Sequence, residues 1–65
     1  MSYRILYFRG PILEGTAEAD TSDLVEAAKI ASAQHPDLTA EIWQNDRKVA
    51  LCRPSWDHQF KHEPR

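Results

Sequence analysis

The sequence lacks most of the features that assign a function directly. Its 65 residues include one cysteine and two glycines. A lone Cys52 excludes an internal disulfide and the paired-cysteine spacing of zinc and redox motifs. No phosphate-binding glycine loop, Gly-x-Ser-x-Gly turn or His-Glu-x-x-His pair occurs. We therefore expect neither an enzyme nor a cofactor-binding protein.

Positive charge is also scarce. Eight Lys and Arg residues are outnumbered by ten Asp and Glu residues, which gives a formal net charge of −2. Modules that bind nucleic acid through its phosphates usually carry a net positive face, so general nucleic-acid binding is disfavoured. The apolar run near the start ends at Arg9 and is too short for a signal peptide or a membrane span. We expect a cytoplasmic protein that makes no membrane contact.

The length allows one small domain with a thin core, because a chain of this size buries only about 60% of its unfolded surface. We place this domain at residues 1–53. Pro54 ends the last strand-like run, and residues 54–65 form a polar tail that we expect to be partly disordered and mobile beyond about Phe60.

The first strand is predicted at residues 3–8, which are rich in aromatic and branched side chains. Alternation places Tyr3, Ile5 and Tyr7 on one face, with Arg4, Leu6 and Phe8 on the other. Both faces are largely apolar, which favours a central position in the sheet.

Residues 12–19 allow two interpretations. They form either a second strand beside the first, with Gly15 at a bulge, or a loop of unusual length for so small a domain. We favour the strand. The loop alternative leaves a three-stranded βαββ fold.

A helix is predicted from about Thr21 to Gln34. The short oxygen-bearing side chains at residues 20–23 suit a helix start, and Pro36 ends the helix. The apolar stripe at three- and four-residue spacing should be buried, flanked by Val25 and Ile30. Its members are Leu24, Ala27, Ala28 and Ala31.

A hairpin is predicted at residues 39–52, with Asn45-Asp46 as a two-residue turn. In that register Ile42 faces Val49 and Ala40 faces Leu51, all on the helix side. Trp43 and its partner Lys48 then lie on the opposite side of the sheet, with Glu41, Ala50 and Cys52. The predicted fold is α+β, a four-stranded antiparallel ββαββ sheet in the order 2-1-3-4 with one helix on one face.

Three segments have a recognisable sequence pattern: residues 3–8, His35-Pro36-Asp37, and the start of the hairpin at residues 41–47. With these segments the sequence resembles short uncharacterised proteins of alphaproteobacteria that look like strand-strand-helix-strand-strand units. The similarity covers residues 2 to about 53. Asn45 stands where such hairpins often have glycine, which leaves the turn type open. The resemblance implies a fold and no activity.

Three groups of side chains are candidate sites. His58 and His62 have the four-residue spacing of metal ligands on a helix, with Cys52 or Asp57 as a third ligand, but a solvated tail is the simpler interpretation and we expect no metal site. Trp43 beside Arg47 and Lys48 has the composition of a stacking site, but cross-strand packing without a ligand is the favoured interpretation.

The third candidate is an acidic block at residues 14–26, opposed by an excess of basic residues at 47–65. Such asymmetry can steer a charged partner or a second copy of the chain, but helix-start chemistry together with ordinary solubility is the favoured explanation.

The leading functional hypothesis is a non-catalytic protein-interaction module that uses the sheet face away from the helix. We expect an apolar patch there, made of Leu6, Phe8, Trp43 and Ala50. The partner is an unidentified protein or a second copy in a weak homodimer. The alternative is a nucleic-acid or nucleotide binder that uses Trp43, Arg47 and Lys48. The tail side chains Trp56 and Phe60 are separated by one helical turn and are predicted to leave this face free.

Overall fold

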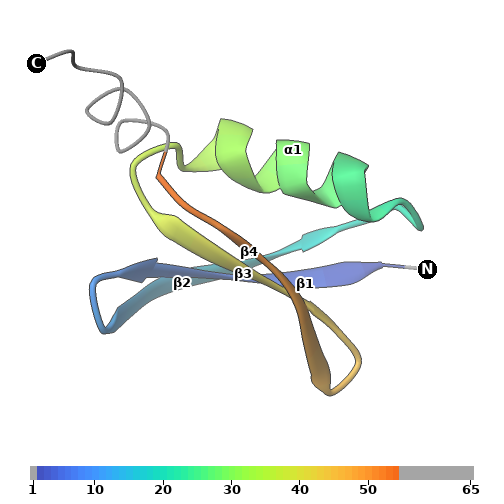
Figure 1. Cartoon of the computed structure of the whole chain (residues 1–65), viewed down its shortest axis with the longest axis horizontal. Helices are drawn as coiled ribbons and strands as arrows, with labels where there is room; N and C mark the ends of the chain where they lie inside the picture. Colours follow the sequence, from blue (N-terminus) through green and yellow to red (C-terminus); the bar gives the residue numbers. More distant parts are fainter. Residues whose placement is uncertain (1, 55–65) are drawn as a thin grey trace, which may run out of the picture.

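The computed structural model describes residues 2–54, which form one antiparallel sheet with a helix over one face (Figure 1). The elements are β1 (Tyr3–Arg9), β2 (Ile12–Ala19), α1 (Leu24–Gln34), β3 (Thr39–Gln44) and β4 (Arg47–Cys52). Across the sheet the order is β2-β1-β3-β4. The predicted α+β class and strand order are confirmed, and β2 is a strand rather than a loop.

Strand β1 lies inside the sheet because β2 pairs with one of its edges and β3 with the other. Its side chains divide between the faces as alternation predicts. Tyr3, Ile5 and Tyr7 are buried beneath the helix, and Ile5 has no exposed surface. Leu6 and Phe8 lie on the opposite face and are half-buried.

The two hairpins have the same construction. Each has a two-residue turn that begins with a left-handed backbone conformation, at Gly10 (φ 60°) and Asn45 (φ 57°). Two residue pairs follow the turn, and then one extra residue shifts the register. The extra residue is Glu14 in the first hairpin and Val49 in the second. The first strand pair therefore has the predicted bulge, with Glu14 as the extra residue and the predicted Gly15 next to it, opposite Tyr7.

Helix α1 begins three residues later than expected. The carboxylate of Asp23 accepts a hydrogen bond from the Val25 backbone N–H at 3.1 Å and caps the helix. Thr21 instead accepts from the Asp23 N–H at 3.1 Å and forms a turn ahead of the cap. The predicted end at Gln34 is confirmed.

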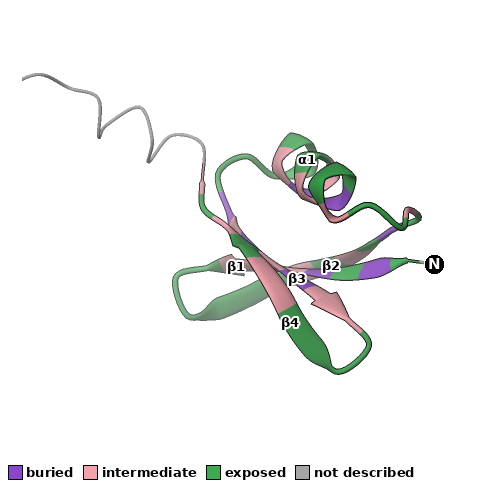
Figure 2. Ribbon diagram, turned by 45° about the vertical axis from the view of Figure 1, so that its right-hand side comes forward, coloured by how far each residue is buried: buried purple, intermediate pink, exposed green. Residues whose placement is uncertain are grey.

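The core lies between α1 and the sheet, where the buried residues gather (Figure 2). Ala27 and Ala31 have no exposed surface, so the helix approaches the sheet closely. Val25, expected beside the buried stripe, is 62% exposed, whereas Leu38 joins the core unexpectedly. The buried residues are Tyr3, Ile5, Tyr7, Ala19, Ala27, Ala31, Leu38, Ala40 and Ile42.

Two tyrosines of β1 connect the strand to the two ends of the helix. The Tyr3 hydroxyl donates to the Ser22 carbonyl at 3.4 Å, just before α1 begins. The Tyr7 hydroxyl donates to Oε1 of Gln34 at 2.7 Å, where α1 ends. Both rings are buried while their hydroxyls are hydrogen-bonded, which avoids the cost of burying an unpaired polar group.

Candidate functional site

The candidate site is the sheet face away from α1, which we call the open face. No helix or strand within residues 2–54 covers it (Figure 1). Residues paired across neighbouring strands share a face, so the strand registers arrange the open face in three rows. From β2 towards β4, the first row is Glu18, Arg4, Trp43 and Lys48, the second is Thr16, Leu6, Glu41 and Leu51, and the third is Leu13, Phe8 and Thr39.

The bulge in the second hairpin changes the expected composition of the open face. The pair Trp43 and Lys48 has the predicted register, but beyond it the unpaired Val49 shifts every partner by one residue. Ile42 therefore faces Ala50 rather than Val49. A shift of one residue moves side chains to the opposite face.

Three predicted placements are wrong for this reason. Ala50 and Cys52 were expected on the open face but pack against the core. Leu51 was expected under the helix, but it lies opposite Glu41 on the open face and is 50% exposed. Leu51 therefore replaces Ala50 in the apolar patch, and the patch gains a large side chain in place of a methyl group.

Apolar side chains occupy both sides of the open face. Leu6 and Phe8 on β1 adjoin Leu13 on β2, which is 52% exposed. Trp43 and Leu51 lie on the β3 and β4 side. Leu6, Phe8, Trp43 and Leu51 are next in sequence to residues that pack in the core or against it. The same strands therefore supply both the core and the exposed patch.

Glu41 separates the two apolar groups and is held by both of its oxygens. Its Oε1 accepts a hydrogen bond from the Trp43 indole N–H at 3.1 Å. Its Oε2 lies 3.6 Å from Nζ of Lys48. The carboxylate thus fixes the indole and partly neutralises the lysine, so the centre of the open face is polar but internally paired.

The three residues of the predicted stacking site do not share a face. Trp43 and Lys48 are direct cross-strand partners on the open face. Arg47 pairs with Gln44 instead, and neighbouring residues of a strand point to opposite sides. Only one cation therefore adjoins the indole on the open face from the β4 side, and that cation is already paired with Glu41.

Two shallow hollows open near the first row and share Arg4 and Trp43. The larger has a volume of about 460 Å³ and reaches Ser2 and Glu18. The other, of about 290 Å³, includes Leu6. Asn45 and Asp46 of the hairpin turn line both hollows. Their walls mix acidic, basic and aromatic groups, which suits the side chains of a partner better than a buried substrate.

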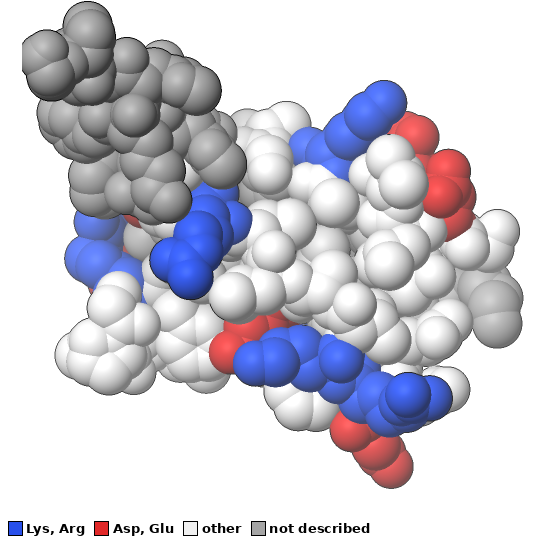
Figure 3. Space-filling model, viewed as in Figure 1, with Lys and Arg blue, Asp and Glu red and all other residues white. Residues whose placement is uncertain are grey.

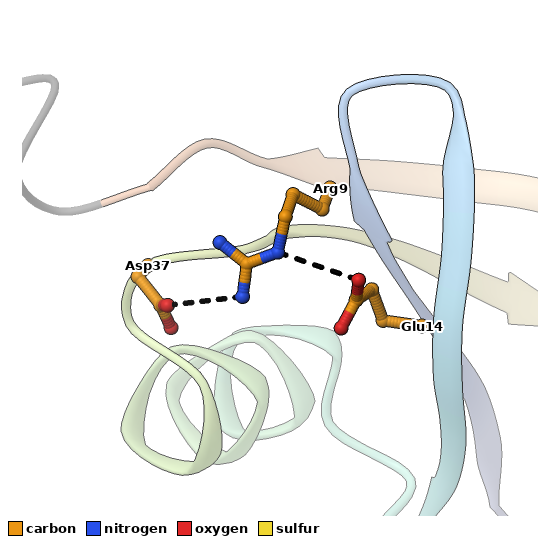
Figure 4. Close-up of polar contacts among 3 residues, drawn as sticks. All are labelled: Arg9, Glu14 and Asp37. Carbon is orange, nitrogen blue, oxygen red and sulfur yellow. Dashed lines mark hydrogen bonds and ion pairs between the residues drawn. The ribbon is translucent and has the colours of Figure 1, made fainter.

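At the other end of the sheet, an exposed arginine connects the first hairpin to the loop after α1 (Figure 4). Nε of Arg9 lies 3.3 Å from Glu14, the extra residue of the first bulge, and a terminal guanidinium nitrogen lies 3.5 Å from Asp37. The arginine side chain is 60% exposed, so solvent weakens both ion pairs. These contacts hold loops together and form no site.

Two protonatable groups, Tyr7 and Cys52, lie on the core side of the sheet. Burial raises the pKa of the Cys52 thiol. Burial also raises the pKa of Tyr7, and the nearby Cys52 adds to that effect. Both groups therefore stay protonated at neutral pH, whereas a nucleophilic cysteine needs a lowered pKa. The His35 ring packs edge-on against Tyr7, with ring centres 4.4 Å apart, in a structural contact.

The described residues contain no candidate metal site, and residues 55–65 lie outside them. Within residues 2–54, no three His, Cys, Asp or Glu side chains are grouped for a metal ion. The predicted His58 and His62 pair lies outside the described residues, and so do Trp56 and Phe60. None of the helices in the described part of the chain has the length and apolar character needed to span a membrane.

Comparison with known proteins adds no family. No protein-family model matches the chain, and neither the curated proteins nor the solved structures include a match. The resemblance to short alphaproteobacterial proteins therefore stays a prediction.

Proposed function

We propose that this chain is a non-catalytic, cytoplasmic protein-interaction module that binds its partner through the open face. The main support for this proposal is a pair of leucines, Leu13 and Leu51, which are about half exposed at opposite sides of one sheet face. Between them lie the half-buried side chains of Leu6, Phe8 and Trp43. Apolar groups gathered on one face favour association, because covering them removes their surface from water.

The charges on the open face suit a protein partner. Two acidic groups, Glu18 and Glu41, and two basic groups, Arg4 and Lys48, lie among the apolar residues. Glu41 already has two polar contacts. An interface of this type has an apolar and aromatic centre with polar groups at its rim. A phosphate backbone would instead meet the carboxylates of Glu18 and Glu41, which gives nucleic-acid binding less support.

The test is affinity capture from a lysate of the cells that produce the protein, with two matched variants. Leu51→Asp places a charge on the open face, where the native leucine is 50% exposed. Val25→Asp makes a similar change on the outer side of α1, where the valine is 62% exposed. Neither position is in the core, so both variants should fold.

We expect wild type and Val25→Asp to retain the same partner, and Leu51→Asp to lose it. Equal capture by all three proteins would contradict use of the open face. Recovery of RNA, with retention that falls steeply as salt rises, would instead support the nucleic-acid alternative that uses Trp43, Arg47 and Lys48.

A further inference from the structure

We propose that the open face binds a second copy of this chain, with the two sheets stacked face to face about a two-fold axis parallel to the strands. This inference rests on the proposed function, since it uses the same face and names its partner. The order of charges in the first row supports this arrangement. That row runs Glu18, Arg4, Trp43, Lys48 from β2 to β4.

When the strand order of a second copy is reversed, the charges at the ends of its first row lie opposite unlike charges in the first row of this copy. A two-fold axis parallel to the strands and centred between β1 and β3 keeps each row in place but reverses the order of the strands. Glu18 then meets Lys48 of the second copy, and Lys48 meets its Glu18. In the middle of the row, Arg4 meets Trp43 of the second copy, a contact between a cation and an aromatic ring. Every contact occurs twice, as a two-fold interface requires.

The second possible axis in the plane of the sheet gives no such match. An axis perpendicular to the strands exchanges the first and third rows and keeps the order of the strands. Glu18 would then meet Leu13, and Arg4 would meet Phe8. No acidic group would meet a basic one. In the second row, Glu41 would meet Glu41 of the second copy, which sets like charges against each other. The arrangement of charges therefore selects the axis parallel to the strands.

The remaining rows are compatible with this arrangement. In the second row, Leu6 meets Glu41 of the second copy, and Leu51 meets Thr16. Glu41 enters the interface with its indole hydrogen bond and its lysine contact already formed, so its carboxylate is not left unpaired. In the third row, Phe8 meets Thr39. Stacked sheets normally cross at about 30°, and the long side chains of Glu18 and Lys48 span the resulting offset.

Figure 3 shows how the charges are distributed in one view of the molecule. Basic side chains form a band along the lower part of this view, where β4 and its turn lie, with acidic atoms directly against the band (Figure 3). On the open face, edge strand β4 contributes Lys48 and edge strand β2 contributes Glu18. The sheet is therefore basic along one edge and acidic along the other, and reversal of the strand order brings the unlike edges together.

The size of the face indicates a weak dimer. Four strands about 4.8 Å apart and three rows about 7 Å apart cover roughly 400 Å² of sheet per copy. Stable complexes bury about 800 Å² of accessible surface on each partner. The face is at or below the lower limit for a permanent interface, so the two copies should exchange rapidly and associate only as concentration rises.

The test is sedimentation velocity on the full chain with two charge reversals, Glu18→Lys and Lys48→Glu. Each reversal places like charges opposite each other twice in the dimer. We expect each to raise the dimer dissociation constant about tenfold or more. An equimolar mixture of the two variants should restore association, because all four charges then meet their opposites. The matched controls Glu26→Lys and Lys29→Glu make the same charge changes on exposed positions of α1 and should leave dimerisation unchanged.

The outcomes separate this inference from the proposed function. A wild-type chain that stays monomeric at millimolar concentration would contradict the proposal that a second copy binds the open face. Partner capture that depends on Leu51 would still support the proposed function. A dimer that is lost in Leu51→Asp but unaffected by the charge reversals would contradict the two-fold axis parallel to the strands. It would still support the open face as the dimer interface. A monomer whose melting temperature falls sharply in Leu51→Asp shows that the chain covers its own face, which overturns both.

Discussion

The indole N–H of Trp43 donates to the carboxylate of Glu41, two residues earlier on β3, at 3.1 Å. Residues i and i+2 of a strand share a face, so this contact lies entirely on the open face. The same carboxylate lies 3.6 Å from Lys48, the cross-strand partner of Trp43. One acidic residue thus sets the orientation of the largest aromatic group on the proposed interface.

We predict that Glu41→Ala releases the indole and that Glu41→Gln does not. Glutamine retains an oxygen that accepts the indole hydrogen bond, whereas alanine retains none. Loss of the bond should reduce the free energy of unfolding by about 1 kcal/mol, measured by urea denaturation. The Trp43 indole N–H resonance should move only in Glu41→Ala, and Trp56→Phe assigns the second indole signal. The same resonance shift in both variants would contradict the contact.

The core leaves little tolerance for lost volume. Ile42 on β3 has no exposed surface and faces α1 beside Ala40. Truncation of such a residue costs about 2 to 5 kcal/mol, and domains of this size rarely have more than a few kcal/mol to lose. We expect Ile42→Ala to be largely unfolded at room temperature and Ile42→Val to retain a cooperative thermal transition by circular dichroism. A stable Ile42→Ala domain would mean that the core packs elsewhere.

The two glycines should respond differently to the same substitution. Gly10 has φ 60°, and an added Cβ would meet no atom within 4 Å. Gly10→Ala should therefore lose about 1 kcal/mol through backbone strain alone. Gly15, also in open space, has no positive φ, so Gly15→Ala should be neutral or slightly stabilising. Equal effects in chemical denaturation would contradict the turn geometry of the first hairpin.

Stability should fall on the alkaline side. Burial raises the pKa of Cys52 above its ordinary value of 9.0, and that of Tyr7 above 10.0. The folded state therefore prefers the protonated groups, and their contribution is fully present below pH 9.0 and lost as pH rises through the folded pKa values. Melting temperatures between pH 7 and 11 should decline less steeply in Cys52→Ala. An identical decline in that variant would show that the thiol is not responsible.

The sequence predicts most of the fold because strand alternation and turn residues are local signals. Tyr3, Ile5 and Tyr7 identify the buried side of β1 by spacing alone. Pro36 predicts the end of α1 because it excludes the helical conformation from the residue before it. The late helix start was missed because both Thr21 and Asp23 can cap a helix, and only the folded chain shows which one does.

The composition of the open face was harder to predict, since it depends on one extra residue in β4. Nothing in the run from Arg47 to Cys52 resembles a bulge signal, whereas in β2 a glycine, Gly15, directly follows the extra residue Glu14. The signal that was available is the parallel between the hairpins, each with a two-residue turn. Applying the first bulge to the second would have moved Leu51 to the open face and Ala50 to the core.

The most direct measurement is a concentration series of two-dimensional NMR spectra on the labelled full chain, from micromolar to millimolar. The account predicts that backbone resonances of the three open-face rows shift together, with Leu6, Trp43 and Leu51 among them, while resonances on the outer side of α1 around Val25 and Lys29 stay fixed. Shifts centred on α1, or spectra that do not change across the series, would contradict association through this face.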